Sequence, residues 1–302
     1  MRVGRKSMAE RFAVPLGGSG RAWPLRRRSR AGLRPSIVVA AFEGWNDAGE
    51  AASRAVGHLV RAWGAVPLAE IDPEEFFDFT ELRPEISIVD GQHREVSWPA
   101  TTVSLAGAEG GGPDVVLLEG PEPHLRWRAY CDAVVGIARR ARATRVVTLG
   151  AYLSEVSHAR PVPVSGVSSD DDLLARHGLS PSLYEGPTGI VGVLGPALDR
   201  AGLASTSVWA SVPCYSVPVS AKAALALVRV AAGIVGRAVE TSELEEDAAG
   251  YERRMDELVR DDENVAAYVA RLEEMEDVVG AELAAEGLAE EIQRYLRGRQ
   301  PG

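Results

Sequence analysis

Apolar and polar residues are grouped along the middle of the chain in blocks that predict strands and helices in turn. Short, fully apolar runs such as 37–42 and 115–119 are typical of strands buried on both faces of a sheet. Longer stretches with apolar residues at three- and four-residue steps, such as 221–239, indicate helices. Strands that alternate with helices form a mostly parallel sheet with right-handed crossovers. The pattern therefore predicts an α/β fold.

The remaining elements follow from the same pattern. It predicts further strands at 65–71, 145–149, 188–194 and 205–212, a hairpin of 86–90 and 95–98 around Gly91-Gln92, and helices at about 47–63, 125–143, 170–178 and 196–201. Residues 156–167 are interpreted as a loop or an edge strand, and 107–113 as a Gly-rich surface turn.

The composition changes at about residue 243. Apolar residues there, including Leu244, Tyr251, Met255 and Leu258, recur at helical steps with charges between them. This indicates a helical hairpin or a short coiled coil that either packs on its own domain or pairs with another subunit. A further amphipathic helix is expected at 282–297. We expect a basic tail at 1–34, an α/β/α domain at 35–240 and a helical extension at 241–302.

Charge is unevenly distributed in this chain of net charge −10. The first 34 residues carry +9, which predicts a disordered basic tail or an upstream extension from a wrongly chosen start codon. The acidic remainder disfavours nucleic acid as a partner, because phosphate binding needs clustered positive charge. No apolar run reaches the length of a membrane span. Without a signal sequence, and with Cys131 and Cys214 as the only cysteines, we expect a cytoplasmic protein.

Candidate site residues follow the predicted strands. Because the carboxyl ends of parallel strands meet at one edge, they form a candidate binding rim. The rim comprises Glu43, Trp45, Asn46, Asp47, Glu119, Glu122, Tyr152 and Glu155, with His124, His158, Tyr215 and Ser216 as further candidates. Paired carboxylates could exchange protons, or bind a cation or the hydroxyls of a sugar.

Structural interpretations compete with this hypothesis. Asn46 and Asp47 are typical of a turn and a helix cap, with Glu50 as partner in a capping box. Glu119 and Glu122 flank a proline and are typical of a solvated acidic turn. The histidines lack metal-ligand spacing, and the sequence contains no nucleotide-binding loop and no nucleophile–base pair. We therefore expect no catalytic residues, no metal site and no cofactor.

Five stretches carry a resemblance to a known family. They are AAFEGWNDAGEAAS (40–53), LLEGPEPHLRW (117–127), VVTLGAYLSEVSHARPVPV (146–164), VWASVPCYSVPVSAKAALALV (208–228) and YERRMDELVRDDENVAAYVARLE (251–273). In combination they resemble the proteasome assembly chaperone 2 (PAC2) family, in its bacterial, actinobacterial-type branch.

The resemblance implies a three-layer α/β/α sandwich similar to nucleoside phosphorylases, with a helical C-terminal extension. It also implies a non-enzymatic assembly chaperone or scaffold that acts through homo-oligomerisation, with a trimer as one option, and through proteasome-related protein contacts. The terminal hydrophobic-Tyr-any motif with which family chaperones dock on proteasome rings is absent from the end, Gly298-Arg-Gln-Pro-Gly302. The alternative is a protein that binds a nucleoside-like small molecule, or a hydrolase or ligase, using the acidic rim.

Overall fold

The computed structural model describes residues 15–16, 35–91, 93–108, 112–215, 219–275 and 277–278. Of the predicted basic tail, only the two-residue strand β1 (Pro15–Leu16) is described. The rest of that tail, the predicted helix 282–297, the chain terminus, Gln92 of the hairpin turn and the candidate Ser216 lie outside the described residues.

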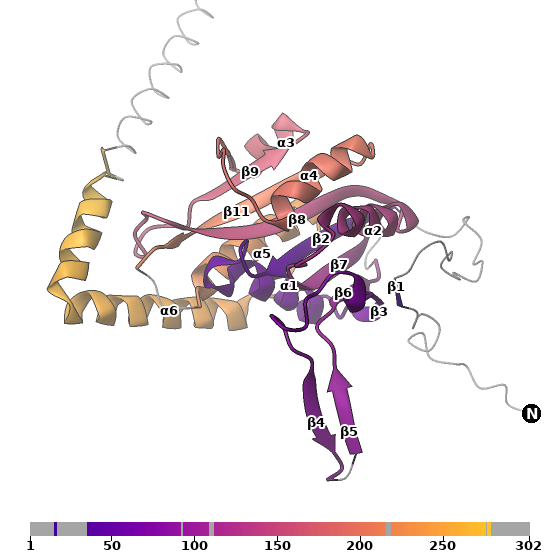
Figure 1. The fold of residues 1–302 in the computed structure, drawn as a ribbon. Helices are drawn as coiled ribbons and strands as arrows, with labels where there is room; N and C mark the ends of the chain where they lie inside the picture. Colours follow the sequence, from indigo (N-terminus) through magenta and orange to yellow (C-terminus); the bar gives the residue numbers. More distant parts are fainter. Residues whose placement is uncertain are drawn as a thin grey trace, which may run out of the picture.

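Nine strands form one sheet in the order β1-β3-β6-β7-β2-β8-β11-β9-β10 (Figure 1). Its parallel centre consists of β7 (Asp114–Pro121), β2 (Ser36–Glu43), β8 (Ala143–Ser154) and β11 (Ser205–Pro213). The flanks are β3 (Val66–Ile71) and β6 (Thr101–Ala106) on one side, and β9 (Val164–Ser168) and β10 (Ser180–Pro181) on the other. Antiparallel pairs occur only on these flanks of the described sheet, so the predicted mostly parallel arrangement is confirmed.

Helices cover both faces of the sheet and complete the predicted α/β/α sandwich. Alternate residues of β2 point into two cores: Val39 and Ala41 pack with one pair of helices, Val38 and Ala40 with the other. The first pair is α1 (Ala51–Ala62) and α5 (Ala221–Val235), and the second is α2 (Trp127–Arg140) and α4 (Ile190–Arg200). Short elements complete the domain: η3 (Ala48–Glu50), η4 (Pro73–Glu75) and α3 (Asp171–Arg176).

The hairpin predicted around Gly91 is present as β4 (Glu85–Val89) and β5 (His93–Ser97). It forms a separate two-stranded sheet and projects away from the body of the molecule (Figure 1). The turn has positive φ at both Asp90 and Gly91, which is the geometry that an Asp-Gly pair favours in a tight hairpin.

Two predictions about secondary structure are wrong. Residues 188–194 were expected to form a strand but open α4, because an apolar run rich in β-branched residues does not distinguish a strand from a buried helix. The strand β6 was not predicted. Its polar threonines fit the sheet because the Thr101 hydroxyl lies 2.6 Å from the Tyr130 hydroxyl inside the core.

The C-terminal extension begins with α6 (Ser242–Asp261), whose apolar seam packs on its own domain. Leu244, Tyr251 and Met255 are buried in the core that α1 and α5 share. The backbone is extended at Asp262, whose carboxylate accepts hydrogen bonds from the N–H groups of residues 264 and 265 and so caps a second helix at 263–275. This helix turns away from α6 instead of returning alongside it, so the extension is bent and is not a hairpin (Figure 1).

No helix in the described part of the chain combines the length and the apolar character that crossing a membrane requires.

Candidate functional site

The loops after β2, β7 and β8 meet at one edge of the sheet, as the parallel arrangement predicts. The N–H of Glu122 donates to the Glu43 carbonyl at 3.0 Å, and the N–H of Ala151 donates to the Asn46 carbonyl at 2.8 Å. The candidate rim residues of these three strands therefore lie on connected loops. Their side chains, however, divide into groups with different surroundings.

The first group closes the centre of the edge. Asn46 is buried, and its Nδ2 donates to Glu122 Oε1 at 2.7 Å. The same oxygen accepts the N–H of Ile190, the first residue of α4, at 2.6 Å. A Cβ on Gly189 would overlap both Asn46 Nδ2 and Glu122 Oε1. We call Asn46, Glu122, Gly189 and Ile190 the edge lock; it fills the position where an α/β sheet commonly leaves a ligand crevice.

Asp47 caps the following helix. Its Oδ1 accepts the N–H of Ala52 at 2.6 Å and that of Ser53 at 3.1 Å, so two donors at the start of α1 are satisfied. Burial raises the pKa of Asp47, against the lowering effect of these hydrogen bonds. The capping role is confirmed, but the reciprocal Glu50 contact is not made: Glu50 has φ 52° and its side chain caps nothing.

Glu43 and Glu119 form the second group. Alternate residues of β2 and β7 point toward α1. In this alternation, Glu43 follows Ala41 on β2 and Glu119 follows Leu117 on β7. Burial raises the pKa of both carboxyls. Proximity to Asp47 raises the pKa of Glu43 further. The Arg61 guanidinium lowers the pKa of Glu119, and proximity to Glu43 raises it. Within the described chain, neither carboxylate makes a hydrogen bond or an ion pair with a side chain.

A cleft of about 310 Å³ adjoins this pair, between α1 and the first turns of α6. Glu43, Gly57 and Arg61 line it on the domain side, and Glu243 and Asp247 line it on the extension side. Arg54 spans it with an ion pair to Asp247 at 3.2 Å. The cleft is strongly polar, with charges of both signs and an excess of carboxylates.

Trp45 and Tyr152 form the third group, which faces solvent. Trp45 is 70% exposed and Tyr152 is 41% exposed. The Tyr152 hydroxyl accepts a hydrogen bond from Ser211 at 3.1 Å, and its ring lies against Trp209. The further candidate His124 is also at the surface, where its Nδ1 accepts the N–H of Asp78.

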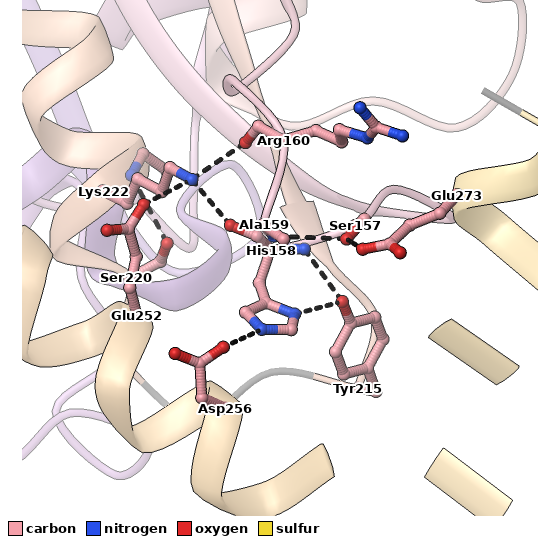
Figure 2. Close-up of polar contacts among 11 residues, drawn as sticks. Ser157, His158, Ala159, Arg160, Tyr215, Ser220, Lys222, Glu252, Asp256 and Glu273 are labelled. Atoms are coloured by element: carbon pink, nitrogen blue, oxygen red, sulfur yellow. Dashed lines mark hydrogen bonds and ion pairs between the residues drawn. The ribbon is translucent and has the colours of Figure 1, made fainter. Parts of the chain in front are cut away.

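The fourth group, at the ends of β8 and β11, is covered by the extension (Figure 2). His158 is only 4% exposed. Its Nδ1 lies 2.8 Å from the Tyr215 hydroxyl, and its Nε2 lies 3.2 Å from an oxygen of Asp256 on α6. Burial raises the pKa of Tyr215. Glu155 accepts a hydrogen bond from the Tyr268 hydroxyl of the second extension helix at 3.5 Å.

Lys222 completes the contact between the domain and the extension. Its ammonium donates to the carbonyls of His158 and Arg160 at 2.6 and 2.9 Å, and pairs with Glu252 of α6 at 2.6 Å (Figure 2). We call the contacting set the extension anchor. It comprises Ser157, His158, Arg160, Tyr215 and Lys222 of the domain, and Glu252, Asp256, Glu273 and Asp277 of the extension.

Sequence reasoning did not identify Lys222 or Asp256. A signal was present for Lys222, because it and Lys6 are the only lysines in a chain rich in arginine. Residues 256 and 158 are so far apart in sequence that no local pattern links them.

The contacts of the extension anchor hold the extension against the domain. Beside His158 only about 10 Å³ of space remains, which is at most enough for one water molecule. Among the described residues there is no group of three His, Cys, Asp or Glu side chains that could hold a metal ion. The histidine is therefore enclosed between the domain and the extension and has no room for a substrate.

Comparisons with known proteins give the family. The PAC2 family model matches residues 41–259. The crystal structure of a PAC2 family protein from Streptomyces avermitilis shares 43% identity over 78% of this chain and 99% of that chain, with a TM-score of 0.72. A proteasome-assembly chaperone homologue from Mycobacterium tuberculosis shares 43% identity over 77% of this chain and 99% of that chain, with a TM-score of 0.70.

More distant structures share the fold alone. An archaeal proteasome activator from Pyrococcus furiosus is 18% identical over 76% of this chain and 96% of that chain, with a TM-score of 0.58. Among curated proteins, none matches the chain significantly. The match of the family model to most of the chain, together with two close structural relatives, shows that the chain belongs to the PAC2 family.

Proposed function

We propose that the protein is a non-enzymatic assembly chaperone or scaffold, which acts in the cytoplasm through contacts with other proteins and with further copies of itself. The observation that carries the proposal is that the strand-end edge is filled at its centre and along β8 and β11, although a cleft remains beside Glu43 and Glu119. The edge lock occupies its centre and the extension anchor covers the ends of β8 and β11. An enzyme of this architecture would need that edge open.

The identity of the partner is supported by the family. The relative from Mycobacterium tuberculosis is described as a proteasome-assembly chaperone homologue, and we extend that description to this chain. The proposed partners are proteasome subunits before they have closed into a complete particle. Exposed apolar side chains such as Trp45 and Trp98 offer contacts of the kind that protein interfaces use.

The test is an assembly assay with purified proteasome subunits from the same organism. We expect the full chain to bind unassembled subunits and to speed the appearance of the complete particle on native gels. Deleting the whole extension would expose the core that Tyr251 and Met255 cover, so point variants are preferable. Lys222→Met with Asp256→Ala should loosen the extension and reduce the effect on assembly. A wild-type chain that neither binds subunits nor changes the assembly rate refutes the proposal.

A second candidate is the binding of a small, hydroxyl-rich or cationic molecule, such as a nucleoside or an amino sugar. The observation in its favour is the pair Glu43 and Glu119, which lie beside an open cleft without ion-pair partners in the described chain. Hydroxyls or an ammonium group would supply the missing hydrogen-bond donors.

This candidate is tested by a thermal-shift screen with nucleosides, sugars and amines. A ligand at 100 times its Kd stabilises the folded state by about 2.7 kcal/mol. Gly57→Leu fills the cleft from α1, where a new Cβ meets only ordinary contacts of 3.5 Å and 3.7 Å. A shift seen with the wild type and lost in this variant supports the site, whereas no shift with any compound counts against it.

A further inference from the structure

The lining of the cleft between α1 and α6 limits the ligands that it can bind. Leu244 is the only apolar side chain in the lining, and no Phe, Tyr or Trp of the described chain belongs to it. Nucleobases are commonly bound by stacking on such rings. The volume of about 310 Å³ is at the lower end of the range for small-molecule sites. The cleft therefore fits a small aliphatic ligand that carries charges.

The charges of the cleft differ in whether they already have partners. Arg54 pairs with Asp247 at 3.2 Å, so these two neutralise each other. The side chains of Arg61, Glu43 and Glu243 form neither an ion pair nor a hydrogen bond within the described chain. Together with the adjoining Glu119, which is also unpaired there, they present one free cation and three free carboxylates.

Arg61 and Glu119 lie on either side of Gly57, a residue of α1 without a side chain. A Cβ on Gly57 would be 3.5 Å from Arg61 Nη1 and 3.7 Å from Glu119 Oε2. The Arg61 guanidinium lowers the pKa of Glu119, so its charge acts on that carboxylate, yet the two form no ion pair. A ligand can therefore present an anion to the arginine and a cation to the carboxylate. An α-amino acid carries both of these charges on one carbon atom.

His58 adds a hydrogen-bond acceptor to the lining. It is only 7% exposed, and its Nε2 lies 2.7 Å from the carbonyl oxygen of Glu240. Because a carbonyl oxygen only accepts, Nε2 of the neutral ring carries the proton and Nδ1 is an acceptor. Within the described chain this Nδ1 makes no hydrogen bond, although buried polar atoms normally have a partner. An ammonium group, which has three donors, would supply one.

We propose that the cleft binds a basic α-amino acid, such as lysine, ornithine or arginine. The α-carboxylate pairs with Arg61, and the α-ammonium lies between Glu43 and Glu119. The cationic side chain of the ligand reaches Glu243 on α6. This inference rests on the second proposed function and narrows its ligand to one chemical class. Because the ligand contacts both α1 and α6, its binding also fastens the extension to the domain.

The test is isothermal titration calorimetry of the full chain with lysine and with three probes that each lack one of its groups. Norleucine lacks the side-chain ammonium, cadaverine lacks the carboxylate, and ε-aminocaproate lacks the α-ammonium. Each probe should bind about tenfold more weakly than lysine or weaker still, which is the loss expected for one hydrogen-bonded charged group.

Two variants assign the groups of the ligand to residues. Arg61→Gln should weaken the binding of lysine by about tenfold and leave that of cadaverine unchanged. Glu243→Gln should reduce the affinity for lysine to that for norleucine. Both residues are exposed, so both variants should keep the melting temperature of the wild type. Glu246→Gln removes a carboxylate of α6 that is outside the lining, and this matched control should bind lysine like the wild type.

A second measurement follows the extension. Saturating lysine should slow amide hydrogen exchange in the first turn of α6, because the bound ligand joins that turn to α1. Unchanged exchange there, no binding of lysine, equal affinity for lysine and cadaverine, or undiminished lysine binding by Arg61→Gln overturns the inference. Binding of a nucleoside or an amino sugar but not of lysine also overturns it, yet leaves the second proposed function standing. The chaperone proposal is decided separately, by the subunit assembly assay.

Discussion

Gly189→Ala probes the edge lock directly. The glycine has φ −91° and ψ −168°, a conformation that alanine adopts without strain, so the backbone itself does not resist the change. The new methyl group would overlap Asn46 Nδ2 and Glu122 Oε1 and would lie 2.6 Å from Asn46 Oδ1. Both neighbours hold hydrogen bonds at this point, so neither moves away without breaking one.

The magnitude follows from two contributions. Forcing extra volume into a packed site costs about 1–3 kcal/mol. Losing the hydrogen bond between Asn46 and Glu122, or that between Ile190 and Glu122, adds about 1–2 kcal/mol. We expect the free energy of unfolding to fall by about 2–5 kcal/mol. In a chain of this size, that corresponds to a drop in melting temperature of roughly 3–8 °C.

The assay is urea unfolding followed by tryptophan fluorescence and by circular dichroism, which should coincide if the transition is two-state. Gly57→Ala is the matched control, because Gly57 lies inside α1 and a Cβ there meets only ordinary contacts. That variant should be as stable as the wild type or more stable by up to about 1 kcal/mol.

A double-mutant cycle separates the clash from a general effect. In the background Asn46→Ala, two of the three overlapping atoms are gone, so Gly189→Ala should cost less than it does in the wild type. A Gly189→Ala variant within about 0.5 kcal/mol of the wild type would refute the lock as a packed structure. Equal costs in both backgrounds would show that Asn46 is not the obstacle.

Three further predictions concern single residues. Asp47→Ala should lower the free energy of unfolding by about 1–2 kcal/mol through loss of the cap on α1, measured by urea unfolding and absent in Glu50→Ala. Glu119→Gln should raise the melting temperature at pH 7. Burial raises the pKa of this carboxyl in the folded protein above its unfolded value of 4.5, so the charged form that predominates at pH 7 destabilises the fold. Below about pH 4.5 the carboxyl is protonated in both states, and the gain in melting temperature from the substitution should vanish. Lys222→Met should speed amide hydrogen exchange in α6, whereas Arg229→Gln, which removes an exposed ion pair between the same two helices, should leave exchange unchanged.

Much of the scaffold could be predicted from local pattern. The apolar run 37–42 predicted β2, two short strand-like runs around Gly91-Gln92 predicted the hairpin, and the Asp47 side chain was correctly read as a cap. Each of these depends on residues within a few positions of one another, where chain geometry alone fixes what can interact. The misreading of 188–194 has the same cause, because local pattern was the only information and it was ambiguous there.

The arrangement of the site depends on contacts between distant segments. Glu122 meets Asn46 and Ile190, and His158 meets Tyr215 and Asp256, only because the sheet and the extension bring those segments together. The sequence placed Glu122 and Asn46 on one edge but gave no means to decide whether they faced a ligand or each other. The answer depends on the neighbouring helix α4, and the sequence analysis predicted a strand where α4 begins.

The rim residues differ in whether their polar groups already have partners, and this difference decides what each can do. Asn46, Asp47 and Glu122 direct their polar groups at donors or acceptors of the chain itself, so a ligand would have to displace an existing hydrogen bond. Glu43 and Glu119 carry raised pKa values because partial burial penalises their charge, and in Glu119 the nearby Arg61 guanidinium offsets only part of this penalty. That penalty lowers the stability of the fold at neutral pH. A bound hydrogen-bond donor or cation would therefore gain more binding free energy at this pair than elsewhere on the rim. A scaffold can supply such a group from a protein side chain as readily as an enzyme can from a substrate. Both proposed functions therefore place a binding partner in the cleft beside α1. An arginine or lysine of a bound protein would pair with these carboxylates as well as a small molecule would.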